Sequence, residues 1–277
     1  MLLPWEFSPL VLAACLGALF FYLRGWRRNR RDGHPGPGTW GLLGFLAGLL
    51  LIYGVMQTRF DYLAQHMLWI HRLQHLVLHH LGPFLIIMGG AHPAFASGLP
   101  VRLRDSVLFR NPPVRALYRL IQHPLVACIL FVGLIAFWLI PEVHFTAMLS
   151  ARRYQVMNWS MLIDGLLFWW LALEIRPVAR GRTLGYGTRM LMLLAVVPPQ
   201  IYIGAHIALA DHSLYSVYNV CGRAWPIDPL VDQEIAGIIT WIPAAMMSGL
   251  GLLVVLARWM HASVLPAPAG GDAAPAG

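Results

Sequence analysis

The stretch Asp61–Gly89, DYLAQHMLWIHRLQHLVLHHLGPFLIIMG, is apolar enough to cross a membrane and also carries five histidines. Ionisable side chains at membrane depth are costly, and they normally face a protein interior or a wet cavity. Five imidazoles in one apolar span therefore indicate a function, and metal binding is the first function to consider because imidazole is a common ligand of copper and zinc.

The composition of the chain predicts an integral membrane protein. Its 277 residues are 58% hydrophobic and 12% charged, and the mean hydropathy is +0.62. Soluble domains carry roughly 25% charged residues. The net charge of +8 comes from basic residues that are all arginine and that cluster between apolar runs, a pattern that orients membrane helices. We therefore expect contact with membrane lipid and no nucleic-acid partner.

Apolar runs of roughly 20 residues predict an all-α polytopic membrane helix bundle of about seven transmembrane helices. Arginines divide 15 to 4 between the two sides of this bundle. That bias predicts an outside N-terminus and a cytoplasmic C-terminus, in a multi-pass protein of the inner (plasma) membrane. The predicted spans are 7–23, 39–56, 62–88, 124–140, 154–173, 188–210 and 234–257.

One membrane domain is expected to occupy residues 1–260. Within it, residues 99–122 alternate basic and apolar positions at helical spacing, which is typical of amphipathic segments that lie on a membrane surface. Residues 261–277 are rich in alanine, proline and glycine and have no apolar face, so we expect a disordered tail.

The histidines of the opening stretch are not equivalent. His71, His75 and His79 are spaced i, i+4, i+8, so they share one helix face, and two imidazoles at i, i+4 can hold one metal ion. Methionines and Cys221 occur on the same predicted side, and imidazole with soft sulfur ligands suits copper. The candidate metal ligands are His66, His71, His75, His79, His206 and His212.

Sequence motifs for catalysis are lacking. The chain has no Walker-type glycine loop, no GxSxG and no HExxH, so we expect no enzymatic activity. Asp164 lies inside an apolar span, where a carboxylate indicates a function and would pair with Arg72 or with a histidine.

Four segments together resemble the CtaG-type cytochrome c oxidase assembly factors. HRLQHLVLHHLGPFLIIMG, which begins at His71, resembles the family's His-Met-x-Gln-His run with its following proline and glycine, although Arg72 stands where methionine is common. LYRLIQHPLVA, LLFWWLAL and VDQEIAGIITWIP resemble three further family segments. The chain departs from the family where a second His-x-x-x-His is common, because it has Tyr154 and Asn158 there, and His144 nearby is a possible substitute.

The resemblance implies a membrane protein that matures a haem–copper oxidase. The expected role is copper binding and delivery to the oxidase catalytic subunit, with a periplasmic copper donor as a second partner. Two alternatives remain open on the residues alone. One is a b-type haem redox protein with His75 and His206 as iron ligands. The other is a metal permease with His71, His75 and His79 as successive sites.

Overall fold

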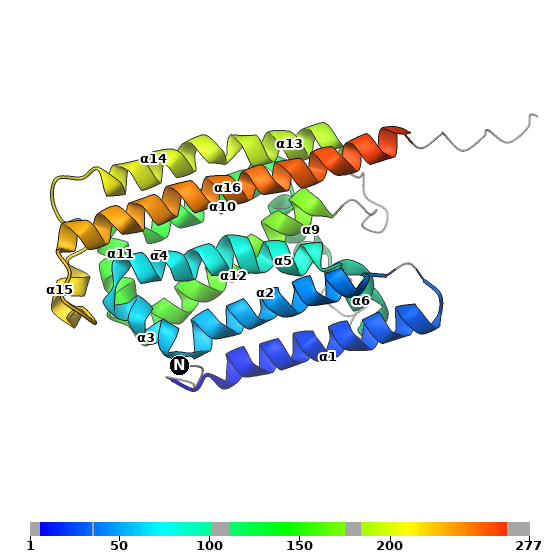
Figure 1. Cartoon of the computed structure of the whole chain (residues 1–277), viewed down its shortest axis with the longest axis horizontal. Helices are drawn as coiled ribbons and strands as arrows, with labels where there is room; N and C mark the ends of the chain where they lie inside the picture. The colour runs from blue at the N-terminus through cyan, green and yellow to red at the C-terminus, as the bar shows by residue number, and fades with distance from the viewer. Residues whose placement is uncertain (1–5, 35, 101–110, 175–183, 265–277) are drawn as a thin grey trace, which may run out of the picture.

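Long helices lying side by side make up the computed structural model, which describes residues 6–34, 36–100, 111–174 and 184–264 (Figure 1). The all-α prediction is confirmed for these residues, which contain no strand. The elements are α1 (Pro9–Arg31), α2 (Thr39–Gln57), α3 (Arg59–His66), α4 (Leu68–Leu76), the π-helical turn η1 (Val77–Leu81), α5 (Gly82–Met88), α6 (Ala91–Gly98), α9 (Pro112–Ile121), α10 (Pro124–Trp138), α11 (Pro141–Met148), α12 (Ala151–Leu173), α13 (Tyr186–Ala195), α14 (Val197–Ala208), α15 (Val217–Cys221) and α16 (Pro229–Val264).

Five helices of the described residues are long and apolar enough to span a membrane: α1, α2, α12, the α13–α14 pair and α16. A sixth is added if α9 and α10, which meet at 74°, are taken as one span. The predicted count of seven is therefore not confirmed. Two predicted spans account for the difference. The span predicted at 124–140 corresponds to α10, which has 15 residues and is long enough only together with α9. In the histidine stretch, extended backbone at Met67 (φ −141°) separates α3 from α4 and a π-helical turn separates α4 from α5.

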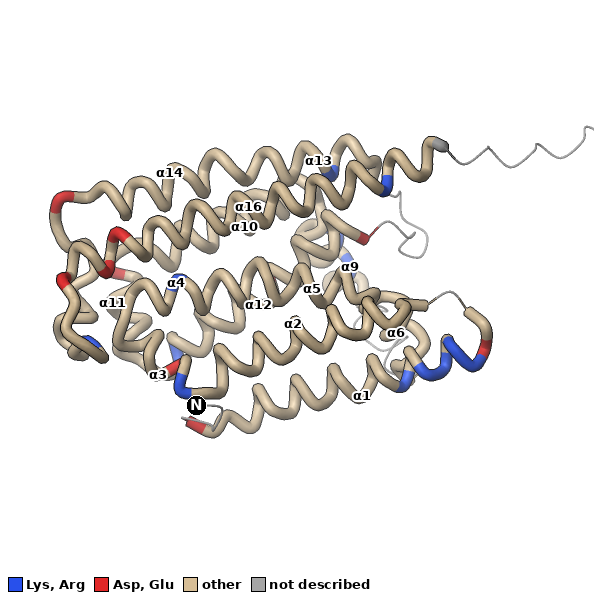
Figure 2. Tube along the Cα trace, in the orientation of Figure 1, with Lys and Arg blue, Asp and Glu red and all other residues tan. Residues whose placement is uncertain are grey.

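Charge is unevenly distributed along the bundle (Figure 2). Arginines gather at the C-terminal end of α1, and α13 and α16 carry one each toward the same end of the bundle, whereas acidic residues are frequent at the opposite end, near α14 and α15. This distribution has the form that the positive-inside rule describes. The orientation relative to a membrane stays a prediction.

The surface segment predicted at 99–122 is described only in part. Residues 101–110 lie outside the described residues, and Pro112–Ile121 forms α9, in which no residue is buried. An exposed amphipathic helix next to a span is the form expected of a membrane-surface segment. At the other end of the chain, α16 continues to Val264, so the predicted tail begins as helix, and residues 265–277 lie outside the described residues.

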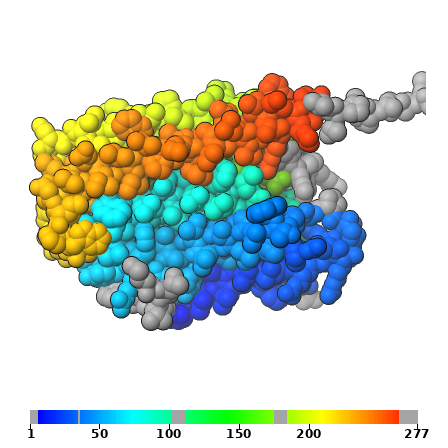
Figure 3. Space-filling view, viewed as in Figure 1, coloured from blue at the N-terminus to red at the C-terminus, as the bar shows by residue number. Residues whose placement is uncertain are grey.

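The histidine stretch forms the centre of the bundle. The run α4–η1–α5 packs against α2, α12 and α16. Part of it reaches the surface in a strip between α2 and α16 (Figure 3). Its remaining faces are inside the bundle, and four of its five histidines, from His71 to His80, are buried. The fold therefore directs these imidazoles at protein and away from lipid.

A proline and a tryptophan account for the irregular turn η1. Pro83 has no N–H, so the carbonyl of His79, four residues earlier, loses its α-helical donor. The indole Nε1 of Trp169 on α12 donates to that carbonyl at 3.2 Å. The two backbones can approach because α12 has Gly165 here, where a Cβ atom would lie 2.5 Å from the His79 oxygen. Trp169, which lies in the segment LLFWWLAL, thus satisfies the His79 carbonyl that Pro83 leaves without a donor.

Replacing Trp169 with phenylalanine should lower the free energy of unfolding by about 1–3 kcal/mol more than the same change at Trp170. The first change leaves the buried His79 carbonyl without a donor, and an unmet buried group costs that much. Trp170 is the matched control, because its indole N–H is buried without a hydrogen-bond partner in the described chain. Denaturant unfolding in detergent measures both; equal losses would contradict this role of the Trp169 bond.

Candidate metal centre

Three imidazoles from two separate segments meet at one end of the bundle. The ring centroid of His71 lies 4.3 Å from that of His75 on the same helix and 5.1 Å from that of His144 on α11. The ring of Tyr154 on α12 is 6.1 Å from His71. The side chains of His71 and His144 are fully buried, and His75 is 1% exposed. Access to this site is therefore closed in the structure.

Hydrogen bonds assign the proton on His75. Arginine can only donate, so Arg72 Nη1, 3.2 Å from His75 Nδ1, makes that nitrogen the acceptor. The proton is then on Nε2, which donates to Asn158 Oδ1 at 3.1 Å. Arg72 is held in turn by donation from its Nε to Thr240 Oγ1 at 2.9 Å. Both nitrogens of His75 are thus occupied, one of them by a cation.

His144 is held in the same manner on α11. Its Nδ1 donates to the Trp138 carbonyl at 3.0 Å, because a carbonyl can only accept. Its Nε2 lies 3.0 Å from the hydroxyl of Tyr218 and accepts from it. Burial lowers the pKa of His144 to about 4, so the ring is neutral at pH 7 and Nε2 keeps a lone pair.

His71 differs from both neighbours. Neither of its ring nitrogens has a hydrogen-bond partner among the described side chains and backbone groups. A buried polar atom without a partner costs roughly 1–3 kcal/mol, and in a native structure it calls for an explanation such as an ion or water. The unpaired nitrogens of His71 therefore make it the first candidate for a ligand in this cluster.

A second polar layer supports the imidazoles. Asp61 on α3 accepts from the Gln74 amide at 2.8 Å and from the Gln65 amide at 3.0 Å, and its Oδ1 lies 2.8 Å from the Tyr154 hydroxyl. Gln74 also donates to the Val55 carbonyl at 2.7 Å, which links α4 to α2. Burial raises the pKa of Asp61 to about 6 although these hydrogen bonds favour its charged form. This layer holds Tyr154 and α4 in place.

The first turn of α4 is capped from another helix. Asp232 on α16 accepts from the backbone N–H groups of Leu68 at 3.3 Å and Trp69 at 2.9 Å. It also forms a buried ion pair with Arg223, whose Nε is 3.2 Å away. Carboxylates at a helix N-terminus satisfy free N–H groups and interact well with the helix dipole. Asp232 therefore fixes the start of the helix that carries His71 and His75.

The remaining predicted ligands lie apart from this cluster. His66 on α3 is partly exposed and lies 2.8 Å through Nδ1 from the Tyr62 carbonyl. His206 and His212 line one surface pocket on α14 with Asp211, which contacts His212 at 2.7 Å. His206 is thus at the surface while His75 is buried, and nothing here supports the haem alternative that paired them. Within the described chain, no three His, Cys, Asp or Glu side chains form a group that could hold a metal ion.

Asp164 pairs with a histidine, one of the two partners that the sequence left open. His79 Nε2 lies 2.9 Å from Asp164 Oδ2, and the His79 ring stacks on Phe131 at a centroid distance of 4.1 Å. His79 continues the helix face of His71 and His75 as predicted, but it belongs to a separate group deeper in the bundle. The structure thus divides the predicted row of histidines in two.

A family model described as "Cytochrome c oxidase caa3 assembly factor (Caa3_CtaG)" matches residues 20–262. The chain belongs to this family. The resemblance seen in the sequence is confirmed, and the family is one of cytochrome c oxidase assembly factors. The apolar helices fit a membrane location.

The chain is also similar to three mycobacterial proteins whose names give no function. The chain is 24% identical over 264 residues to an uncharacterized protein of Mycobacterium leprae and 22% identical over 263 residues to uncharacterized proteins of Mycobacterium bovis and Mycobacterium tuberculosis. These alignments cover 92% of this chain but 39% of each relative, so the chain spans about two fifths of their length. No solved structure matches the chain.

The departures from the family pattern fall inside the site. Tyr154 and Asn158, which replace the second histidine pair, contact His71 and His75 respectively. The ring of His144, the nearby histidine that the sequence offered as a substitute, lies 5.1 Å from that of His71. Sequence reasoning did not assign roles to Asn158, Tyr218 or Thr240, and an uncharged polar residue in a span gives no signal that separates a ligand support from an ordinary helix contact.

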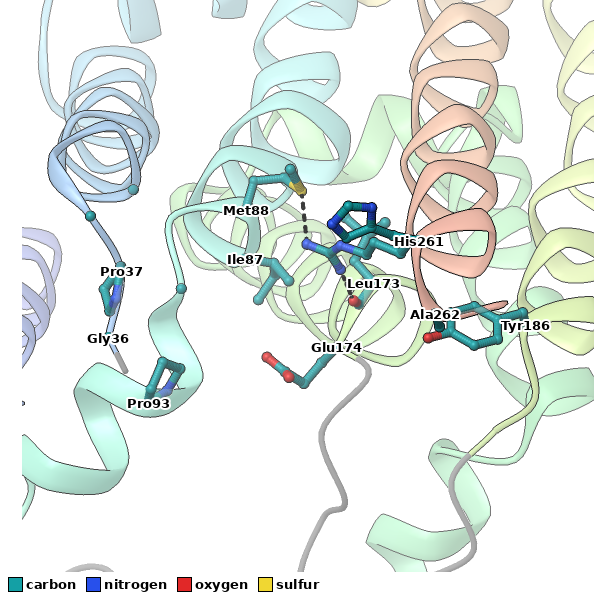
Figure 4. A pocket seen from close by; sticks show the side chains of 14 residues that line it. Gly36, Pro37, Ile87, Met88, Pro93, Leu173, Glu174, Tyr186, His261 and Ala262 are labelled. Carbon is teal, nitrogen blue, oxygen red and sulfur yellow. Dashed lines mark hydrogen bonds between the residues drawn. The ribbon is translucent and has the colours of Figure 1, made fainter. Parts of the chain in front are cut away.

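A larger opening lies at the other end of the bundle (Figure 4). This pocket has a volume of about 570 Å³ and lies between the ends of α2, α5, α12 and α16. Arg258 crosses it and donates to the Leu173 carbonyl and to the Met88 sulfur. These contacts satisfy a carbonyl at the C-terminal end of α12, where a cation is favourable. None of the six predicted ligands lines the pocket.

Proposed function

We propose that the chain is an assembly factor of the plasma membrane that carries copper to the catalytic subunit of a haem–copper oxidase. The metal is cargo. His71, His75 and His144 would hold it after their side chains have moved, because as they stand in the structure they do not form a group that could hold a metal ion. The observation that carries this proposal is His71, a fully buried imidazole with two unpaired nitrogens between two other imidazoles.

The chemistry of the donor set supports copper. Neutral imidazoles suit copper, zinc, iron and nickel, and a carboxylate-free site favours a soft cation such as Cu(I) over magnesium or calcium. His75 and His144 each donate one ring N–H to a fixed oxygen, on Asn158 and on the Trp138 backbone. Metal-binding histidines have such outer partners, which orient the ring and leave the other nitrogen free for the metal.

Weak copper binding suits a protein that must pass the metal on. To bind the metal, His75 must release Arg72 and His144 must release Tyr218, because those groups occupy the two nitrogens that would become ligands. The loss of these hydrogen bonds reduces the net affinity, which helps release to a partner. A periplasmic donor would load the site from the end where α11 and α15 cover it, and the oxidase subunit would receive copper by ligand exchange.

Replacing His71 with phenylalanine should remove one bound Cu(I) per protein. Changes to outer partners already cost about 10–100-fold in metal affinity, so loss of a ligand should cost at least about 100-fold. His206→Phe and His212→Phe are controls of the same chemistry at the surface, and they should leave the stoichiometry unchanged. Competition with a coloured Cu(I) chelator measures all three. If His71→Phe binds as much copper as the unchanged protein, the site assignment is wrong.

A deletion strain tests the cellular role. Oxidase activity should fall without the protein and return when copper is added to the medium or when the intact gene is restored. The His71→Phe gene should not restore activity at low copper, whereas the His212→Phe gene should. Normal oxidase activity in the deletion strain at low copper would overturn the delivery role.

A further inference from the structure

The turn η1 places two consecutive histidines in the interior of the bundle. The side chain of His79 is fully buried and that of His80 is 3% exposed, and their ring centroids are 5.0 Å apart. In a regular α-helix, neighbouring residues point about 100° apart, so two adjacent side chains seldom share one interior region. A π-helical turn changes this phase, and such turns are frequent at functional sites.

Several nitrogens in this region lack partners. His79 donates from Nε2 to Asp164, and its buried Nδ1 has no hydrogen-bond partner among the described groups. Both nitrogens of His80 are buried and unpaired as well. Both polar side-chain atoms of Gln200 on α14 are also buried without a hydrogen-bond partner among the described groups. A fold does not leave this many polar atoms unmet without an occupant such as water or an ion.

A small cavity extends from this region to His75, one residue of the outer site. It has a volume of about 10 Å³, which is about the room that one water-sized occupant needs. His75 and Arg72 line one part of it, and His79 and His80 line another. Met161 on α12 adds a thioether to the wall. The cavity is thus lined by two imidazoles that have unpaired ring nitrogens and by one methionine.

We propose that His79, His80 and Met161 form a second Cu(I) site, deeper in the bundle than the site at His71. The inference rests on the proposed function, and it adds a second place for the same cargo. Asp164 stands in the position of the carboxylate that commonly accepts the far N–H of a metal-bound histidine, which makes the ring a better ligand. A soft, low-coordinate ion fits a site with two imidazoles and a thioether better than Mg²⁺ or Ca²⁺, which need several oxygen ligands.

The two sites are arranged along one helix. Successive histidines four residues apart rise by about 6 Å along the axis, so the deeper site follows the outer one in a row through His75. Copper that enters at His71 has its next imidazoles at His79 and His80, across the cavity that His75 also lines. The protein therefore holds two ions in sequence.

Counting bound Cu(I) in the full-length protein in detergent tests the second site. The unchanged protein should bind two ions, His80→Phe one, His71→Phe one, and the double variant none. His34→Phe, at an exposed position, is the control and should keep two. Elution as a single species and an unchanged helical circular dichroism signal show which variants are folded. Asp164→Asn is a milder variant, and it should weaken one of the two ions by about 10–100-fold.

The two hypotheses fail in distinguishable ways. One bound ion that is lost in His71→Phe and kept in His80→Phe would overturn the deeper site and leave the proposed function intact. One bound ion that is lost in His80→Phe and kept in His71→Phe would support the deeper site and overturn the outer one. X-ray absorption should show one sulfur neighbour of copper that disappears in Met161→Leu; its presence in that variant would rule out Met161 as a ligand.

Discussion

Replacing Asp232 with alanine should lower the free energy of unfolding by about 3–5 kcal/mol, the usual cost of removing one partner of a buried ion pair. Three groups lose their acceptor at once: the N–H groups of Leu68 and Trp69, and the guanidinium of Arg223. Arg223 stays largely buried, with 12% of its side chain exposed, so water replaces the carboxylate poorly. The start of α4 should fray, and copper binding at His71 should weaken with it.

Two further variants distinguish the loss of the α4 cap from the general effect of removing a negative charge. Glu234 lies on the same helix and is exposed, so Glu234→Ala should change stability by no more than about 0.5 kcal/mol. Asp232→Asn keeps one acceptor oxygen and loses the charge, so its loss should fall between the two. Denaturant unfolding in detergent provides the free energies. A loss below about 1 kcal/mol for Asp232→Ala would show that Asp232 does not hold the helix.

The helices were predictable because each apolar run is long and because a membrane leaves the backbone few alternatives. The breaks within the histidine stretch were not. Pro83 indicates that one carbonyl loses its donor, but the result depends on whether another helix supplies a new donor. Here Trp169 supplies it and Gly165 allows the approach. Trp169 and Gly165 are far from Pro83 in sequence, so the local pattern around Pro83 cannot predict that the His79 carbonyl finds a new donor.

The candidate site shows the same limit. The spacing of His71 and His75 predicts a shared face, and the structure confirms that their rings are adjacent. The third imidazole, His144, comes from a short helix between two spans, and only tertiary packing brings it within 5.1 Å of His71. Tertiary packing also closes the site, because His71 and His144 are fully buried. A sequence shows which groups are ionisable, but not what covers them.

Arg72 places a positive charge next to His75, one of the proposed copper ligands. Its guanidinium donates to His75 Nδ1, and the other nitrogen of His75 is held by Asn158. A metal ion at His75 must therefore displace a cation and also bind close to it. Like charges repel strongly in a buried region where the effective dielectric constant is low. Arg72 would thus oppose the copper binding that we propose at His75.

Replacing Arg72 with methionine, the residue common at this position in the family motif, should tighten Cu(I) binding by about 10–100-fold. A hydrogen bond to a charged group is worth about 1.5–3 kcal/mol, and each 1.4 kcal/mol corresponds to tenfold in affinity. The change frees His75 Nδ1, removes the repulsion and adds a soft sulfur ligand. Competition with a coloured Cu(I) chelator measures the affinity, and copper transfer to the oxidase should slow as binding tightens.

Combining variants tests whether the affinity gain in Arg72→Met depends on His75. Adding His75→Phe to Arg72→Met should cancel most of the gain, because the freed nitrogen is then missing, and the shortfall from additivity measures the coupling of the two side chains. Arg59→Met removes one exposed positive charge elsewhere and should leave the affinity within about twofold. If Arg72→Met binds copper no more tightly than the unchanged protein, His75 is not a copper ligand, and the metal must be held by His71 and His144 without it.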